Sequence, residues 1–345
     1  MRFFSFRRRA FLQNFLISMG ILLGIFLVLF AILVIFSGRY MVYSRSGVQA
    51  DIDWAENMQA TTERKTVDVV PTVTVLPKTA INTGTVRRLS GCYISADRLS
   101  NLEALKKEIA AGAFGTVIVE MKDIYGYFYY KTTMGVPTAS GISTNSVASF
   151  LKGLKDEGYY LVAAIPAFAD QSYCLNHVEL GLPLKSGALW VDDNNCYWMD
   201  PKNEGTLSFL ETIALELSNL GFRELLLNDF YFPLSDSIVY PETEMTKAEV
   251  LDRTVQRLQA DLGGAITLSF GLGNSNTFPS HLENGRIYLN AIHDGNAVLS
   301  TVSQLSLCVE NPEIQLVFIT GSEDERFDSY GHILPLKEAE PLPEE

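Results

Sequence analysis

The chain has 345 residues, of which 47% are hydrophobic and 19% are charged, and its formal net charge is -13. This length permits one large domain or two small ones beside shorter segments. The surplus of acidic residues argues against a nucleic-acid-binding surface, because no basic patch offsets it. We expect a neutral or cationic partner, or an acidic solvated surface without one.

The N-terminal segment predicts a membrane anchor. Four arginines lie within residues 1–9, and residues 10–38 are an uncharged stretch dominated by Leu, Ile, Phe and Val. A helix of about 20 apolar residues spans the hydrocarbon core of a bilayer, and its basic flank stays on the cytoplasmic side. We therefore expect a cytoplasmic segment, a single-pass transmembrane helix in the cell membrane and an extracytoplasmic remainder. The alternative is a cleaved signal peptide, whose apolar region is usually shorter, about 7–15 residues.

Residues 39–88 are polar, rich in Thr and Val, and contain Pro71 and Pro77. They show no helical periodicity, which predicts an extended stalk. The alternation of residues 66–77 also permits an edge strand there. From Tyr40 onward, 22 basic residues stand against 40 acidic ones, so the acidic charge belongs to the part beyond the anchor.

A strand-then-helix pattern begins at Leu89. Capping boxes at Ser100–Glu103 and Thr246–Glu249 start two of the predicted helices, and glycines end most of them. The apolar runs that predict strands are residues 89–95, 114–123, 159–168, 222–229, 265–272, 286–292 and 314–320.

Alternating strands and helices predict parallel βαβ units. We expect a (β/α)8 TIM-like barrel over residues 89–322, since such barrels usually have about 250 residues. The longest insertions, residues 122–144, 167–203 and 230–245, all follow strands. This asymmetry favours the barrel over a doubly wound open sheet, because a barrel carries its site on the loops after its strands.

The C-terminal residues 323–345 are acidic and contain proline, so we expect a disordered tail. Seven strand candidates precede this tail. The barrel is therefore expected to be incomplete at its C-terminal end or closed by another segment.

Polar residues cluster after three of the predicted strands, where a barrel places its functional groups. They are Glu120, Lys122 and Asp123 after the second strand, Asp170, Trp190, Asp192, Trp198 and Asp200 after the third, and Asn228, Asp229 and Tyr231 after the fourth. Carboxylates beside Trp and Tyr suit a sugar site, since aromatic rings stack on sugar rings and paired carboxylates supply acid and base. The competing interpretation is that these acids cap helices and form turns.

Other chemistry is poorly supported. The four histidines show no metal-binding spacing, and the stretch "GLGNSN" has Asn276 where a dinucleotide loop needs its third glycine. We therefore expect no metal and no cofactor. The four cysteines, Cys92, Cys174, Cys196 and Cys308, are widely spaced. Outside the cytoplasm, a Cys174–Cys196 disulfide is the first candidate, and single buried thiols are the alternative.

The segments after the second and third strands resemble a glycosyl hydrolase (TIM-barrel) domain family of bacterial cell-surface proteins, whose substrate is unassigned. The stretch "MKDIYGYFYY" is similar to that family's Lys-Asp-x-x-Gly segment, and "IPAFAD" to its strand ending in an aromatic residue and Asp. The stretch "LWVDDNNCYWMDPKNE" looks like its Trp-x-Asp followed by Trp-x-Asp-Pro. The resemblance covers about residues 89 to 235 and implies a barrel that acts on glycans.

The fourth strand departs from that family. Its members end this strand in roughly Asp-Tyr-hydrophobic-Arg-Phe-Pro, whereas this chain has "NDFYFP". An alignment without gaps on Phe232 and Pro233 puts Asn228 at the family's Asp and Tyr231 at its Arg. An amide cannot act as a general base. Asp229 restores the acid only if the strand ends at Asn228 and the loop re-aims the next side chain, since neighbours on a strand face opposite sides.

The leading hypothesis is a membrane-anchored glycoside-hydrolase-like barrel that acts on a cell-envelope or environmental glycan. Asp229 and Asp123 are its predicted carboxylate pair, with Glu120 in reserve. The predicted sugar-binding residues are Lys122, Asp170, Trp190, Asp192, Trp198, Asp200, Asn228 and Tyr231. The alternatives are an inactive glycan-binding or scaffold module on the same barrel, and a structural envelope protein without a ligand.

Overall fold

The computed structural model describes residues 41–44, 47–50, 88–112, 114–233, 235–240, 245–272, 282–293 and 295–336. The chain divides into two compact units, residues 1–74 and residues 75–345.

In the first unit, β1 (Met41–Ser44) and β2 (Gly47–Ala50) pair as an antiparallel hairpin. This hairpin lies in the segment for which we expected an extended stalk. Two residues separate the strands, which is the connection length that hairpins favour. The predicted cytoplasmic segment and transmembrane helix, residues 1–38, lie outside the described residues. Across the ranges that are described, no helix is both long enough and apolar enough to cross a membrane.

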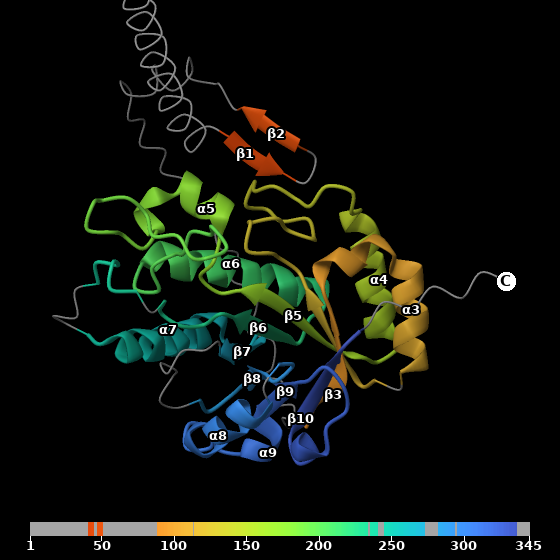
Figure 1. The fold of residues 1–345 in the computed structure, drawn as a ribbon. Helices are drawn as coiled ribbons and strands as arrows, with labels where there is room; N and C mark the ends of the chain where they lie inside the picture. The colour runs from red at the N-terminus through yellow and green to blue at the C-terminus, as the bar shows by residue number, and fades with distance from the viewer. Residues whose placement is uncertain are drawn as a thin grey trace, which may run out of the picture. The chain divides into compact units, whose positions relative to one another are not determined.

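The second unit is a closed barrel of eight parallel strands (Figure 1). The strands are β3 (Ser90–Ile94), β4 (Thr116–Glu120), β5 (Tyr160–Pro166), β6 (Glu224–Asn228), β7 (Thr267–Leu272), β8 (Ile287–Asn290), β9 (Leu316–Ile319) and β10 (Gly331–Pro335). Strands β3 to β9 fall within the seven predicted runs. The prediction of a TIM-like barrel is therefore confirmed.

The predicted C-terminal boundary of the barrel was wrong. Strand β10 lies within residues 323–345, where we expected a disordered tail, and it pairs in parallel with both β9 and β3. This eighth strand closes the barrel. Its sequence, "GHILP", is short, and its acidic, proline-containing surroundings concealed the apolar run.

Helices surround the strands in Figure 1. They are α3 (Leu102–Ala111), α4 (Thr144–Asp156), α5 (Gln171–Asn176), α6 (Glu204–Leu220), α7 (Lys247–Leu262), α8 (Gly295–Leu305) and α9 (Pro312–Gln315), with short 3-10 turns η1 (Ala96–Ser100), η2 (Val178–Leu180) and η3 (Glu325–Phe327).

Two predicted helix starts had different outcomes. The capping box of Thr246 and Glu249 is present at the start of α7. The predicted box of Ser100 and Glu103 was wrong, because Asn101 caps α3 by accepting a hydrogen bond from the Ala104 N–H. The chain enters α3 through the η1 turn, which ends at Ser100 and moves the cap one residue along.

Alternate residues of each strand face the lumen or the helices. The lumen has its own cluster of buried side chains, separate from the larger cluster shared with the helices; it contains Leu89, Ile118, Val162, Ala164, Leu226, Tyr288, Val317 and Ile333. This parity decides which polar residues near the strand ends face the lumen.

A buried polar network fills the lumen near the amino ends of the strands. Glu224, the first residue of β6, forms an ion pair with Arg286, and both are almost fully buried. The Glu224 carboxylate also accepts hydrogen bonds from Tyr160 (3.0 Å), Ser269 (2.6 Å) and Tyr288 (2.8 Å). A buried charge needs this degree of pairing to be tolerated. The network therefore forms the floor of the barrel.

All four cysteines are buried and free. The interpretation as single buried thiols is thus confirmed, and the Cys174–Cys196 disulfide is absent from the structure.

Candidate active site

Three polar side chains share the lumen-facing parity near the carboxyl ends of the strands. Glu120 ends β4, two residues after lumen-facing Ile118, and Asn228 ends β6, two residues after Leu226. Tyr93 of β3 packs against the same lumen cluster. These three residues form the polar layer that we call the mouth of the barrel.

Glu120 is a partly buried carboxyl in this layer. Its Oε2 accepts the Ala96 N–H at 2.8 Å, and the Tyr93 hydroxyl lies 3.4 Å from its Oε1. Burial raises the pKa of Glu120, and the nearby charge of Asp123 raises it further, while the Ala96 and Tyr93 donors act in the opposite direction. Glu120 thus combines a low-polarity environment with two groups that stabilise its ionised form.

Asn228 contacts the same tyrosine from the β6 side. Its side chain is a hydrogen-bond partner of Tyr93. Gly271 of the neighbouring strand makes room for it, since a Cβ built there would lie 2.5 Å from the Asn228 Oδ1. Asn228 is therefore the residue of the β6 end that occupies the lumen. An amide at this position binds but does not exchange a proton.

Asp229 follows β6 in a left-handed turn, with φ 54°. This conformation is uncommon for residues other than glycine, although Asp and Asn tolerate it, and it turns the chain so that strict strand alternation stops at Asn228. The Asp229 carboxyl makes no hydrogen bond or ion pair with any other described residue. Burial raises its pKa, and the negative charge of Asp192 raises it further.

Asp229 remains close to the mouth after this turn. Its charge contributes to raising the pKa of Tyr93, after burial and the charge of Glu120. It also contributes to raising the pKa of Tyr231 to about 12, second to burial and ahead of Asp192. Asp229 therefore lies within electrostatic range of both Tyr93 in the mouth and Tyr231 in the following loop.

An aromatic group stands beside Asp229. The ring of Trp198 lies 5.2 Å from that of Tyr231 and 6.0 Å from that of Trp190, measured between centroids. Asp192 accepts the Trp198 Nε1–H at 3.0 Å and so fixes the indole. Such rings are the usual partners of sugar faces. Trp198 is only 4% exposed, so the expectation that it stacks on a sugar is corrected, and its indole supports the half-buried rings of Trp190 and Tyr231. The structure thus brings together four predicted residues, Trp190, Trp198, Asp192 and Tyr231.

Asp192 and Asp123 both organise turns. Asp192 Oδ1 accepts the N–H groups of Asn194 (2.8 Å) and Cys196 (2.9 Å). Asp123 Oδ1 accepts two N–H groups at 2.9–3.0 Å, and its Oδ2 accepts the Tyr129 hydroxyl at 3.0 Å. Both oxygens of Asp123 are occupied by its own loop. This arrangement makes Asp123 a weaker catalytic candidate than Glu120 or Asp229.

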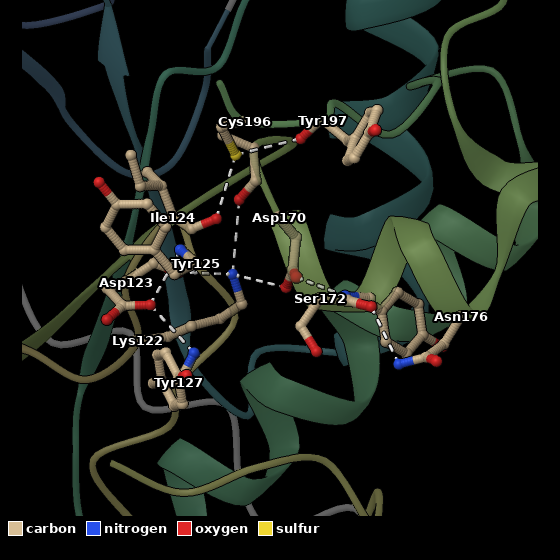
Figure 2. Close-up of polar contacts among 12 residues, drawn as sticks. Lys122, Asp123, Ile124, Tyr125, Tyr127, Asp170, Ser172, Asn176, Cys196 and Tyr197 are labelled. Atoms are coloured by element: carbon tan, nitrogen blue, oxygen red, sulfur yellow. Dashed lines mark hydrogen bonds and ion pairs between the residues drawn. The ribbon is translucent and has the colours of Figure 1, made fainter. Parts of the chain in front are cut away.

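Lys122 and Asp170 do not line an accessible surface. Their side chains are both 0% exposed, and the Lys122 Nζ lies 2.8 Å from the Asp170 Oδ2 (Figure 2). The expectation that they contact a sugar is corrected, because a buried ion pair has no face open to a ligand.

Asp200 belongs to a different part of the loop. Its Oδ1 accepts the Lys202 N–H at 2.9 Å, and burial raises its pKa. Among the residues that the structure describes, no hydrogen bond, ion pair or ring contact joins Asp200 to Glu120 or Asp229. Asp200 therefore stabilises the turn that precedes α6.

Sequence reasoning missed Tyr93. The signal was present, because Tyr93 follows Leu89 and Gly91 at a spacing of two, which gives it the lumen-facing parity of the first barrel strand. A tyrosine at that position presents a hydroxyl to the mouth.

Comparisons with known proteins identify one matching family and several solved structures of limited similarity. A family model described as "Putative glycosyl hydrolase domain" matches residues 91–267. A search of curated proteins finds no match. Among solved structures, a hypothetical protein from Ruminiclostridium thermocellum ATCC 27405 is 22% identical with a TM-score of 0.47, over 52% of this chain and 96% of that one. The GH36 alpha-galactosidase AgaB from Geobacillus stearothermophilus is 10% identical with a TM-score of 0.49, over 74% of this chain and 39% of that one.

Proposed function

We propose that this chain, which belongs to the family described as "Putative glycosyl hydrolase domain", hydrolyses a cell-envelope or environmental glycan with Asp229 and Glu120 as its carboxylates. The observation that carries the proposal is the Asp229 carboxyl, which is partly buried, has a raised pKa and lacks a partner among the described residues. A general acid must hold its proton near neutral pH until the glycosidic oxygen takes it, and a raised pKa serves that role.

The two carboxyls are suited to different roles because their surroundings differ. Glu120 faces two donors, the Ala96 N–H and the Tyr93 hydroxyl, which stabilise its ionised form. Both carboxyls face a like charge, Asp123 for Glu120 and Asp192 for Asp229, but the Asp229 carboxyl has no hydrogen-bond donor among the described residues to offset it. Asp229 is therefore assigned as the general acid, and Glu120 as the carboxylate that activates water or attacks the sugar. Glu120 takes the place that the sequence suggested for Asp123.

The surrounding residues support sugar binding. The half-buried Tyr231 offers a ring beside Asp229, and the Asn228 amide and Tyr93 hydroxyl offer hydrogen bonds to sugar hydroxyl groups. We propose further that residues 10–38 anchor the protein in the cell membrane with the barrel outside, since the basic residues precede the apolar stretch.

A second function is favoured by Asn228. An amide faces the lumen at the end of β6, which suits a glycan-binding module without catalysis. One experiment distinguishes hydrolysis from binding without catalysis. The full-length protein is screened on a glycan array and then incubated with each bound glycan, and new reducing ends are measured. Release of reducing ends supports hydrolysis, whereas binding without release supports the module.

A further inference from the structure

The Lys122–Asp170 ion pair is closed off from solvent, and the Asp170 Oδ2 has the Lys122 ammonium as its partner in place of a hydrogen bond. Besides the Asp170 carboxylate at 2.8 Å, the Lys122 ammonium donates to the carbonyl oxygen of Asp123 at 3.1 Å and lies 3.5 Å from that of Ala169. The rings of Phe128 and Phe209 each lie 5.9 Å from the ammonium. The charges therefore act only on protein groups.

On one side, Asp170 is joined to residues 190–200, which carry Trp190 and Trp198 and are called the aromatic loop. Its Oδ1 accepts the Tyr173 N–H at 2.7 Å and so caps α5, while its own N–H donates to the Tyr197 carbonyl at 2.9 Å. The preceding residue, Ala169, forms an isolated bridge with Trp198. Fixing Asp170 therefore fixes the backbone that carries Trp198.

On the other side, Lys122 begins the turn after β4. The Ile124 carbonyl of this turn accepts the Gln171 N–H at 2.8 Å and the Cys196 thiol at 3.1 Å. Gly126, with φ 88°, lets the turn close over Asp170, since a Cβ there would lie 2.6 Å from the Asp170 Oδ1. Figure 2 shows Lys122 and Asp170 between this turn and the Cys196–Tyr197 segment.

We infer that the Lys122–Asp170 pair is a positioning device that holds two loops at the barrel mouth, the turn of residues 123–127 and the aromatic loop of residues 190–200. These loops carry Asp123, Asp192 and Trp198, so their order would affect glycan binding. That consequence rests on the proposed function. The pair holds the turn of residues 123–127, the start of α5 and the segment of residues 196–198 next to one another. It does not touch the substrate.

This role differs from a contribution to overall stability. Replacing both members of a buried ion pair by well-packed, mainly hydrophobic residues of similar volume is often neutral for stability, whereas removing one member leaves a buried charge and destabilises the fold. The double variant Lys122→Met/Asp170→Asn removes both charges, and its asparagine still caps α5. If the pair only stabilised the fold, the two loops of this variant would be as well ordered as those of the parent.

The test is hydrogen exchange of the full-length protein, read by mass spectrometry over residues 123–130 and 190–200. In the double variant, with the thermal midpoint close to that of the parent, both segments exchange about tenfold faster or more, while the strands keep their protection. The control is Arg286→Met, which breaks a second buried ion pair among the described residues, in the barrel floor. It lowers the thermal midpoint without selectively exposing the two loops.

Unchanged exchange in both loops of the double variant would overturn the inference, as would equal loosening of both loops by Arg286→Met. If the double variant does not fold, Lys122→Leu/Asp170→Asn gives the same test, because it also removes both charges and keeps the cap of α5. Faster exchange of both loops then supports the device, and parental exchange overturns it. No glycan enters the measurement, so its outcome is independent of whether the protein hydrolyses one.

Discussion

Asn228 and Asp229 are neighbours in the chain but have different surroundings at the end of β6. Asn228 completes the strand with its side chain in the lumen against Tyr93, and Asp229 starts a left-handed turn at φ 54° with a carboxyl free of partners among the described residues. The residue that faces the lumen by strand parity is thus uncharged. The residue available for proton transfer is the one that the turn presents.

The like charge of Asp192 contributes to the raised pKa of Asp229, which makes the pH dependence of activity testable. Activity that needs protonated Asp229 falls as the pH rises through its pKa. The Asp192→Asn variant removes the neighbouring charge and lowers that pKa. The alkaline limb of the kcat/KM profile should therefore move to lower pH.

The matched control for this profile is Asp193→Asn, because Asp193 is exposed and adjacent. Its alkaline limb should coincide with that of the parent. An alkaline limb that stays in place in Asp192→Asn would remove Asp192 from this role.

The ionised Asp229 carboxyl should also lower the stability of the folded protein. A raised pKa means that folding disfavours the ionised form, so the penalty is absent below the ordinary Asp pKa of about 3.9 and grows as the pH rises through the folded-state value. Asparagine tolerates the same left-handed turn. Asp229→Asn should therefore unfold at a higher temperature than the parent near neutral pH and at the same temperature at about pH 3. A lower midpoint near neutral pH would contradict this reasoning.

The floor of the barrel should be sensitive to the loss of one charge. Glu224 is 0% exposed and takes three hydrogen bonds besides its ion pair with Arg286. Glu224→Leu leaves the Arg286 charge buried and should cost about 3–5 kcal/mol in the free energy of unfolding. Denaturant titration measures this cost. Lys152→Met, at an exposed ion pair, is the control and should leave the free energy of unfolding close to that of the parent.

Closure of the barrel by β10 predicts that Ile333 is a core residue. It is 0% exposed in the lumen cluster, so Ile333→Ala should cost about 2–5 kcal/mol. Ile292, 39% exposed, is the matched control, and its substitution by alanine should cost well under half as much. Equal small costs at both sites would contradict a structural role for β10.

The sequence predicted most of the fold because long apolar runs mark parallel strands buried on both faces. It failed at β10, where five residues pair at the barrel seam without a long apolar run. The pairing partners of β10 are β3 and β9, and β3 lies at the opposite end of the barrel sequence. Local pattern alone carries no signal for such a contact.

The site was predicted in its residue types and only partly in its geometry. The rings of Trp198 and Tyr231 pack together, and the charges of Glu120 and Asp229 both raise the pKa of Tyr93. Lys122 and Asp170 were expected to contact a sugar because they follow strands, yet they pair with each other across two loops. Burial of a charged pair depends on loops distant in sequence, and a spacing pattern does not show it.

The most direct test is the rate of reducing-end release by the full-length parent and by Asp229→Asn, with Asp193→Asn as control. The substrates are neutral and amino-sugar polysaccharides and purified peptidoglycan. We predict that the parent and Asp193→Asn cleave at least one of them at similar rates, and that Asp229→Asn is about 10²–10⁴-fold slower. Equal release by the parent and Asp229→Asn would contradict the assignment of Asp229 as the general acid.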